Sequence, residues 1–396
     1  MQLRPHQEQA IQSMTDNDKG QVIVPTGGGK TICMIMDAVK QLEDYGTVVV
    51  VAPRILLAEQ LSKEFMEIID KKYNDVDVMH VHSGKIKGVF SSTNPFHIQQ
   101  FVEQNFVNAV GSRTIIFTTY HSLHRVQESG IDVDTIYFDE AHNSVQKNFF
   151  PATDYFSQYA GRCYFFTATP KHSRTPFKVG MNDADVYGDV ICNVPAPKLV
   201  KQGYILPPKV QVFRSRILKK DELVAERDNE QMISAIDNLD KDKVLICAKS
   251  TRQIVSLVSQ TDFVQQLAIR GYSWMTITSK TGAIIDGEKV DRETFFDTLN
   301  DWGRTNKKFV VLHHSILSEG INVNGLEAVL FMRSMDYIGI SQTIGRVIRK
   351  GDADKVFGLV CVPVYSNVGI TTARKVESVV DTIFNKGQAA TTVITR

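Results

Sequence analysis

The amino-acid sequence predicts an α/β protein made of two tandem doubly wound domains, each with a parallel sheet covered by helices. Short apolar strands alternate with helical stretches in both halves of the chain. Several of these strands, such as residues 48–51 and 115–117, are apolar on both faces, as in parallel sheets buried between helices. The length of 396 residues suits two domains of ordinary size.

The first half of the chain carries six predicted strands. Between the second and the third strand, the spacing of Leu57, Leu61 and Phe65 predicts a helix over residues 55–69. The predicted strands cover residues 21–24, 47–52, 76–82, 114–118, 135–138 and 162–167.

A proline cluster marks the predicted boundary between the domains. Four of the 12 prolines lie between residues 195 and 208, around Gly203, which is typical of a linker. We therefore predict one domain over residues 1–205 and a second over residues 206–396. In the second half the predicted strands cover residues 243–248, 272–278, 308–313, 328–332 and 356–362, and the predicted helices cover residues 251–258, 290–302, 340–350 and 372–384.

Composition narrows the class of protein. A content of 43% hydrophobic and 22% charged residues is that of a soluble globular chain. Because the net charge is only +1, any nucleic-acid surface has to be a local basic groove. No apolar run reaches the ~18 residues of a membrane span, and the polar N-terminus is no signal peptide, so we expect an intracellular protein. The five cysteines are scattered without metal-ligand spacing, which favours a reducing compartment and no zinc site.

A glycine-rich segment separates the first predicted strand from a helical pattern. Residues 24–31 read Val-Pro-Thr-Gly-Gly-Gly-Lys-Thr, the layout of a phosphate-binding loop before a helix N-terminus. Lys30 is expected to reach the β- and γ-phosphates, and the Thr31 hydroxyl to bind magnesium. An ordinary tight turn is the alternative, which the Lys-Thr pair argues against. The nucleotide-binding residues of this loop are Thr26, Gly27, Gly28, Gly29, Lys30 and Thr31.

Two carboxylates follow the predicted strand at residues 135–138. Asp139 and Glu140 would lie beside the glycine-rich loop, since the carboxyl ends of parallel strands meet at one edge of a sheet. Asp139 is expected to bind magnesium and Glu140 to polarise the attacking water. The alternative is a solvated acidic turn.

The segments 24–31 and Asp139-Glu-Ala-His142 together resemble motifs I and II of the DEAH-type superfamily 2 helicases. Further segments resemble the other helicase motifs in the right order, from residue 3 to about residue 350. The resemblance implies two RecA-like lobes that hydrolyse ATP with magnesium between them. The matching segments are residues 3–7, 52–54, 82–84, 118–120, 167–170, 245–250, 319–322 and 342–349.

The same resemblance implies roles for individual residues. Arg4 and Gln7 would lie near adenine, and Gly320 and Asn322 near the nucleotide, with Asn322 standing where many relatives carry Asp. Arg346 and Arg349 lie three apart on a predicted helix, and the family would use them as arginine fingers; solvated arginines at a basic helix end are the alternative. The remaining implied residues are Gln342, which faces the nucleotide, and His142, Thr167 and Thr169, which couple nucleotide state to the groove.

A groove for nucleic acid is implied across both lobes. Short hydroxyl side chains, backbone amides at strand ends and a few cations suit phosphate contacts; ordinary loop chemistry is the alternative for each residue alone. The implied residues are Pro53, Arg54, Ser83, Gly84, Thr118, Thr119, Lys249, Ser250, Thr278, Ser279, Lys280 and Ser318.

Three segments, residues 4–7, 203–208 and 342–349, most resemble DNA helicases and translocases related to restriction-enzyme motor subunits. Compact relatives of that kind occur in phages and large DNA viruses. We therefore expect an ATP hydrolase with a monomeric core that acts on DNA and not on a membrane. Three alternatives stay open: an RNA helicase, a nucleic-acid clamp that uses ATP as a switch without unwinding, and the motor subunit of a restriction complex with a separate nuclease partner.

Overall fold

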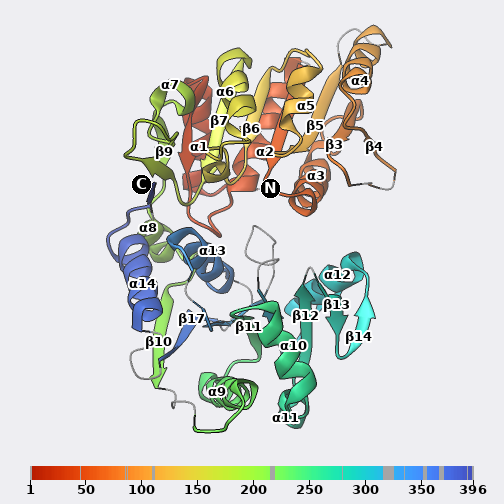
Figure 1. Ribbon diagram of the computed structural model, residues 1–396. Coiled ribbons are helices and arrows are strands. Elements are labelled where there is room, and N and C mark those ends of the chain that lie inside the picture. Colours follow the sequence, from red (N-terminus) through yellow and green to blue (C-terminus); the bar gives the residue numbers. More distant parts are fainter. Residues whose placement is uncertain are drawn as a thin grey trace. The chain divides into compact units, whose positions relative to one another are not determined.

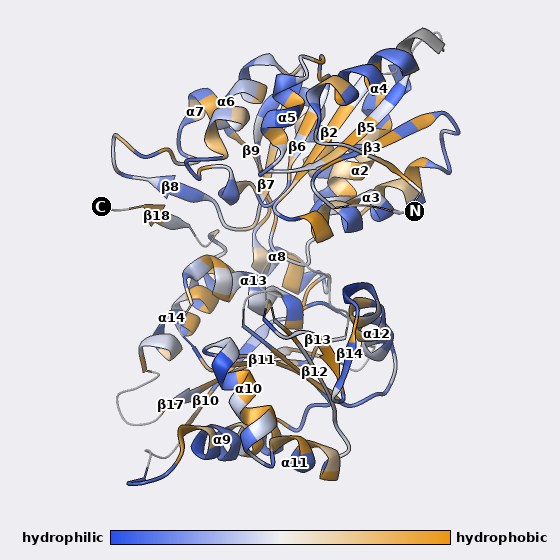
Figure 2. Ribbon diagram, turned by 45° about the vertical axis from the view of Figure 1, so that its right-hand side comes forward, coloured by the Kyte–Doolittle hydropathy of each residue, from blue (hydrophilic) through white to orange (hydrophobic). Residues whose placement is uncertain are grey.

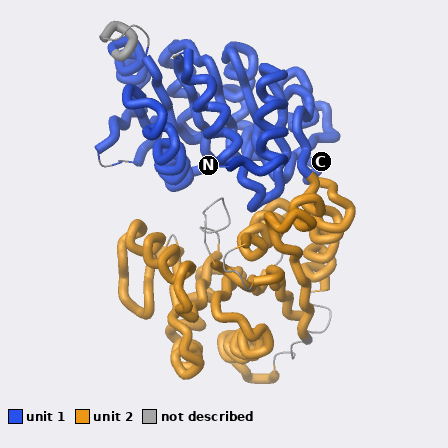
Figure 3. Tube along the Cα trace, turned by 180° about the vertical axis from the view of Figure 1, so that it is seen from behind, with its two compact units in different colours: residues 1–194, 391–396 blue, residues 195–390 orange. Residues whose placement is uncertain are grey.

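The chain forms two compact units, residues 1–194 with 391–396, and residues 195–390 (Figure 3). They are called unit 1 and unit 2 below. The computed structural model describes residues 2–44, 46–84, 86, 88–108, 112–214, 219–278, 280–314, 325–333, 335–350, 355–364, 370–389 and 391–394.

Unit 1 contains an eight-stranded sheet in which every described pair of neighbours is parallel. The strand order is β4-β3-β5-β2-β6-β7-β1-β9. Valines 48–51 of the central strand β2 are at most 1% exposed, as the doubly apolar pattern predicts. The strands are β1 (Lys19–Ile23), β2 (Gly46–Ala52), β3 (Val76–Val81), β4 (Phe90–Ser91), β5 (Arg113–Thr119), β6 (Thr135–Phe138), β7 (Arg162–Thr167) and β9 (Val190–Asn193).

Helices cover the sheet of unit 1 on both faces (Figure 1). Val49 and Val51 of β2 share one core with side chains of α4, α5, α6 and α7. The helices α1, α2 and α3 contact one another in sequence order, and α2 and α3 contact β2. Their bounds are α1 (Pro5–Asp16), α2 (Lys30–Gln41), α3 (Ile55–Ile69), α4 (Pro95–Asn108), α5 (Leu123–Glu128), α6 (Phe150–Tyr159) and α7 (Ala184–Tyr187), with 3-10 turns η1 (Leu42–Asp44) and η2 (Ala141–Asn143).

Unit 2 contains a second eight-stranded sheet, in the order β10-β17-β16-β11-β15-β12-β13-β14. The first six of these strands are parallel, and their apolar side chains form the interior of the unit (Figure 2). The strands are β10 (Pro208–Arg214), β11 (Lys243–Cys247), β12 (Ser273–Thr278), β13 (Gly282–Ile285), β14 (Glu288–Val290), β15 (Phe309–His313), β16 (Ala328–Phe331) and β17 (Gly358–Val364). The helices are α8 (Ala196–Lys201), α9 (Val224–Leu239), α10 (Thr251–Gln260), α11 (Phe263–Ile269), α12 (Arg292–Arg304), α13 (Tyr337–Val347) and α14 (Ile370–Val380), which continues as the π-helical segment η4 (Asp381–Asn385).

The antiparallel hairpin of β13 and β14 was not predicted. Asp286 and Gly287 connect the two strands with φ angles of 47° and 96°. Positive φ at both central residues is the geometry of a two-residue type I′ turn, for which Asp-Gly is a preferred sequence. This dipeptide is therefore the sequence signal that reveals the hairpin.

The proline cluster folds as part of unit 2. Helix α8 begins directly after Pro195 and contacts η4. Ile205 bridges Arg349, and the backbone N–H of Leu206 donates to the carbonyl of Ile348 at 2.7 Å. The compact units thus change at Val194 and Pro195, whereas the proline content led to a predicted boundary near residue 205.

A third, two-stranded sheet joins β8 (Lys171–Ser173) to β18 (Thr392–Ile394). Both strands belong to unit 1, so the chain returns to unit 1 after unit 2 is complete. In the described parts of the chain, no helix combines the length and the apolar character that crossing a bilayer requires.

Two neutral histidines are buried at the end of β3. The imidazole of His80 contacts that of His82 at 3.0 Å and the Ser62 hydroxyl at 3.0 Å. Burial, with a smaller effect of the neighbouring His82, lowers the pKa of His80 from 6.5 to about 4, and burial lowers the pKa of His82 as well. Because the unfolded chain binds these protons more readily, the stability of unit 1 is complete above pH 6.5 and falls as the pH drops toward 4.

We predict that the His80→Gln variant shows a weaker loss of stability on acidification. For the wild type, His80 alone should lower the free energy of unfolding by about 2 kcal/mol between pH 7 and pH 5. Urea unfolding followed by circular dichroism at both pH values measures this difference. The matched control is His97→Gln, which replaces an exposed histidine; equal pH dependence of the two variants would contradict the assignment.

Candidate nucleotide-binding site

The glycine-rich loop joins β1 to α2 in unit 1. Gly27 and Gly29 have φ angles of 84° and 87°, in the left-handed region where a side chain is strained. Gly29 precedes the first residue of α2, and a Cβ placed there would collide with Nε2 of Gln7. The loop is closed by a hydrogen bond from the N–H of Gly28 to the carbonyl of Pro25, at 2.9 Å. Backbone amides can therefore approach a bound anion at a helix N-terminus.

The start of helix α1 holds the loop from one side. Nε2 of His6 donates to the carbonyl of Gly28 at 2.7 Å, and this imidazole is fully buried. Oε1 of Gln7 accepts from the backbone N–H of Arg4 at 2.9 Å. Arg4 and Gln7, both predicted to lie near adenine, are thus placed beside the loop. His6 was missed at the sequence level, although it stands inside the Arg-Pro-His-Gln segment.

The two predicted carboxylates follow β6 and face the loop. Nζ of Lys30 lies 2.9 Å from Oε1 of Glu140, and the two side chains are only 10% and 9% exposed. Glu140 has a φ of 47°, a strained value for a residue with a side chain. The N–H of Asp139 donates to the carbonyl of Val51 at 2.9 Å, which anchors the turn to β2. The structure therefore brings Lys30, Asp139 and Glu140 together.

Burial shapes the electrostatics of this pair of carboxylates. Burial, and then the adjacent Glu140 carboxylate, raise the pKa of Asp139 to about 7, while Lys30 acts in the opposite direction. A bound cation would favour the ionised form of Asp139. Magnesium in nucleotide sites uses one or two protein oxygens and completes its shell with phosphates and water. The Asp139 carboxylate and the Thr31 hydroxyl are donors of that kind, so they fit the ion.

Thr26 adds a second feature that fits a phosphate ligand. Its Oγ1 atom is buried and has no hydrogen-bond partner among the described residues. A buried hydroxyl without a partner costs free energy unless a ligand or water satisfies it.

His142 connects the carboxylates to β7. Its Nδ1 atom lies 3.5 Å from Oε2 of Glu140, 3.1 Å from Oγ1 of Thr167 and 3.4 Å from Oγ1 of Thr169. The N–H of Thr169 donates to Oγ1 of Thr167 at 3.0 Å. The imidazole and both hydroxyl-bearing residues are buried. These three predicted coupling residues thus form one network with Glu140.

The predicted groove residues of unit 1 lie at the ends of the neighbouring strands β2, β3 and β5. Arg54 and Ser83 are exposed there, whereas Pro53 is buried and Gly84 half-buried. Thr118 and Thr119 are buried, and the Thr118 hydroxyl donates to the carbonyl of Val81 at 2.9 Å. The Thr118 hydroxyl therefore donates its hydrogen bond within unit 1.

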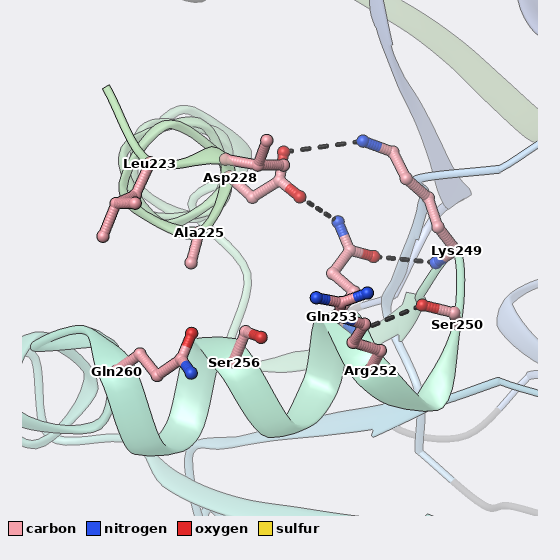
Figure 4. A pocket seen from close by; sticks show the side chains of 10 residues that line it. Leu223, Ala225, Asp228, Lys249, Ser250, Arg252, Gln253, Ser256 and Gln260 are labelled. Atoms are coloured by element: carbon pink, nitrogen blue, oxygen red, sulfur yellow. Dashed lines mark hydrogen bonds and ion pairs between the residues drawn. The ribbon is translucent and has the colours of Figure 1, made fainter. Parts of the chain in front are cut away.

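In unit 2, Lys249 and Ser250 line a cavity of about 450 Å³ between α9 and α10 (Figure 4). Oδ2 of Asp228 accepts from Nε2 of Gln253 at 2.5 Å, and its Oδ1 lies 3.5 Å from Nζ of Lys249. The Ser250 hydroxyl caps α10 by accepting from the N–H of Gln253. Thr278 is buried at the end of β12, and Lys280 is exposed. Ser279, Ser318, Gly320 and Asn322 lie outside the described residues.

Helix α13 of unit 2 carries Gln342, which was predicted to face the nucleotide, and Arg346, one of the two predicted arginine fingers. They lie one turn apart and are 7% and 3% exposed. Arg349 was predicted on the same helix, but α13 ends at Val347, so Arg349 lies after it. Burial, and then the nearby charges of Arg346 and Arg333, lower the pKa of His313 to about 3. His313 is the last residue of β15, so Arg346 lies near the end of that strand.

The first 172 residues match the family model described as "Type III restriction enzyme, res subunit". The whole chain also resembles the ATP-dependent Type ISP restriction-modification enzyme LlaBIII bound to DNA, with a TM-score of 0.73, 18% identity and coverage of 100% of this chain but 31% of that one. A nuclease-deletion mutant of the Type ISP enzyme LlaGI, in complex with a DNA substrate mimic, gives 0.67 and 19% over 99% of this chain and 30% of that one. The chain thus spans about a third of the length of both enzymes.

A third similar structure has nearly the same extent as this chain. S. cerevisiae Dbp5 bound to RNA and ADP BeF3 gives a TM-score of 0.60 and 13% identity over 98% of this chain and 89% of that one. At these identities the likeness concerns the fold. The predicted fold class is confirmed: the chain consists of two tandem RecA-like lobes, as in Dbp5.

Proposed function

We propose that the chain is a nucleic-acid-dependent ATPase of the superfamily 2 helicase type, which moves along or remodels DNA. The observation that carries this proposal is the buried contact of Lys30 with Glu140 beside a glycine-rich loop and a helix N-terminus. A cation, two carboxylates and free backbone amides are the groups that phosphoryl transfer to water requires. The match of residues 1–172 to the res subunit model supports the same function.

Lys30 and Glu140 change partners in this mechanism. A triphosphate on the loop attracts the Lys30 ammonium to its β- and γ-phosphates and thereby releases the Glu140 carboxylate. Glu140 then orients a water molecule and accepts its proton. Magnesium, held by Asp139 and Thr31 when bound, neutralises phosphate charge.

Unit 2 supplies the remaining groups of the proposed reaction. Arg346 and Arg349 stabilise the charge that develops on the γ-phosphate, and Gln342 faces the nucleotide. Gly320 and Asn322 complete the nucleotide contacts, while Arg4 and Gln7 contact adenine. His142, Thr167 and Thr169 report the state of Glu140 to the groove, because their side chains form one hydrogen-bonded network with it.

The proposed nucleic-acid partner is DNA. Two structures with this fold are restriction-modification enzymes bound to DNA or to a DNA substrate mimic, which supports DNA as the polymer. Dbp5, by contrast, is bound to RNA, so an RNA helicase is the second candidate. An ATP-switched clamp would share the binding site without unwinding. A restriction motor would need a nuclease partner, and the large remainder of the two restriction enzymes leaves this alternative open.

Further predictions concern the setting of the protein. The five cysteines are free and buried, which supports a reducing, intracellular location. A monomeric core and a phage or viral origin stay predictions.

We predict that single-stranded or forked DNA stimulates ATP hydrolysis, and that Arg349→Ala lowers the stimulated turnover by about 10³-fold while the nucleotide affinity changes little. Turnover is measured with no polymer, single-stranded DNA, duplex DNA, forked DNA and single-stranded RNA. The control is Lys350→Ala, which removes the exposed neighbouring cation.

Each outcome of this series has a clear meaning. Hydrolysis that no polymer stimulates would contradict the motor, and stimulation by RNA alone would replace DNA as the partner. Equal loss of binding and turnover in Arg349→Ala would contradict the finger assignment.

We predict that Gly29→Ala weakens nucleotide binding, because the left-handed backbone becomes strained and the new Cβ displaces the side-chain amide of Gln7. Titration with a fluorescent ATP analogue measures the affinity. The matched control is Gly130→Ala, which has the same left-handed strain at a φ of 68° but open space around the new Cβ. Unchanged affinity in Gly29→Ala would show that the loop does not hold the phosphates.

A further inference from the structure

Strand β18 follows the last residues of unit 2 in the sequence and pairs with β8 of unit 1. The two strands are parallel, with Thr392 opposite Lys171, Val393 opposite His172 and Ile394 opposite Ser173. The N–H of Thr392 donates to the carbonyl of Pro170 at 3.2 Å, and the N–H of Arg174 donates to the carbonyl of Ile394 at 3.3 Å. A strand of three residues gains little from pairing alone, so side-chain contacts have to contribute.

Ile394 supplies such a contact. Its half-buried side chain packs against the hydrophobic core of unit 1, as does that of Val179 nearby in the same unit. Met181 contacts β8, the partner strand of β18, since its N–H donates to the carbonyl of Lys171 at 2.7 Å. Strand β18 is therefore docked on unit 1 through both backbone and apolar contacts.

The segment that leads toward β18 lies beside the segment that enters unit 2. Gly387 follows η4 with a φ of 68°, and a Cβ placed on it would be 3.3 Å from Cβ of Pro195 and 3.5 Å from Cδ of Pro197. The chain thus passes between the units twice, once at Val194–Pro195 and once between Ala389 and Thr391. Within unit 2 the residues next to these two passages, Pro195 and Gly387, lie close to each other. Two adjacent connections restrict relative motion more than a single linker does, because they leave mainly rotation about a common hinge.

The docking point of β18 adjoins the proposed catalytic network. Pro170, which accepts the hydrogen bond from Thr392, directly follows Thr169. Thr169 and Thr167 contact Nδ1 of His142, and His142 contacts Glu140. A continuous series of contacts therefore connects β18, which follows unit 2 in the sequence, with Glu140, the carboxylate that is proposed to orient water.

We propose that β18 is a second connection between the two units and positions residues 167–170, so that movement of unit 2 changes the environment of His142 and Glu140. The effect on Glu140 rests on the proposed function, whereas the second connection rests only on the pairing of β18 with β8. β18 touches no reacting atom, so its residues are positioning residues.

The test compares two substitutions at one position. Thr392→Pro removes the N–H that bonds to Pro170, whereas Thr392→Val keeps it and removes only a hydroxyl that is buried without a partner among the described residues. Amide hydrogen exchange at residues 171–174 should accelerate in Thr392→Pro and not in Thr392→Val. The ratio of DNA-stimulated to basal ATP hydrolysis should fall by about tenfold in the proline variant only, while nucleotide affinity stays unchanged.

Distance measurements provide a readout that does not depend on hydrolysis. Tyr159→Cys in unit 1 and Ile269→Cys in unit 2 place spin labels at residues that are 69% and 76% exposed, and the native cysteines are buried. The distribution of distances between the labels should broaden in Thr392→Pro and keep the wild-type width in Thr392→Val. If the proline variant does not fold, Ile394→Ala replaces it, because it weakens the packing of β18 against the core of unit 1. Ile394→Val is then the control.

Two results would overturn the proposal. Unchanged exchange at residues 171–174 and an unchanged distance distribution would show that β18 is no connection. Accelerated exchange with an unchanged stimulation ratio would show that β18 is docked without positioning the site. A wild type without polymer-stimulated hydrolysis contradicts the proposed function instead, and the distance distributions then still decide whether β18 connects the units.

Discussion

The buried contact between Lys30 and Glu140 is the interaction that joins the two halves of the candidate site in unit 1. Removing a cation and a carboxylate from water costs several kcal/mol for each group, and only a close pair offsets this cost. At 2.9 Å and about a tenth exposure, the pair meets that condition. It requires the loop after β1 and the turn after β6 to lie at one edge of the sheet, although β7 stands between these strands.

This requirement explains the unusual backbone around the pair. Gly29 in the left-handed region lets α2 begin with Lys30, and Glu140 accepts a strained φ at the other side. Strain of this kind persists where surrounding contacts enforce it, and here the anchoring of Asp139 to β2 and the network of His142 provide them. Glu140 therefore holds the Lys30 ammonium, which is the group that we propose to bind a phosphate. The same exchange links nucleotide binding to His142 and, through Thr169 and Pro170, to β18.

Apolar strands and the residues of the turns between them made most of the strands and the glycine-rich loop of unit 1 predictable from the sequence. Residues 135–138 and 162–167 were predicted as strands with the observed bounds, because their side chains are apolar and turn residues limit them. The glycine-rich loop, Asp139 and Glu140 could be placed for the same reason, since parallel strands bring their carboxyl ends together. His6 was missed because its bond to a loop carbonyl depends on how α1 packs.

Long-range pairing limited the predictions for the rest. Strand β18 is three residues long and pairs with a strand more than two hundred residues earlier, so no local pattern could reveal it. The prolines near residue 195 indicated a linker, yet α8 begins there because proline is favourable in the first turn of a helix. The Asp-Gly hairpin, by contrast, had a local signal.

The exchange of partners at Lys30 is tested most directly by nucleotide binding and turnover of Glu140→Gln, which retains the shape of the side chain but removes its charge. Our account predicts that this variant binds ATP at least as tightly as the wild type, because Lys30 is no longer held by a carboxylate, while hydrolysis falls by about 10²-fold or more for lack of a base. Wild-type turnover in Glu140→Gln, or a loss of ATP affinity, would contradict it.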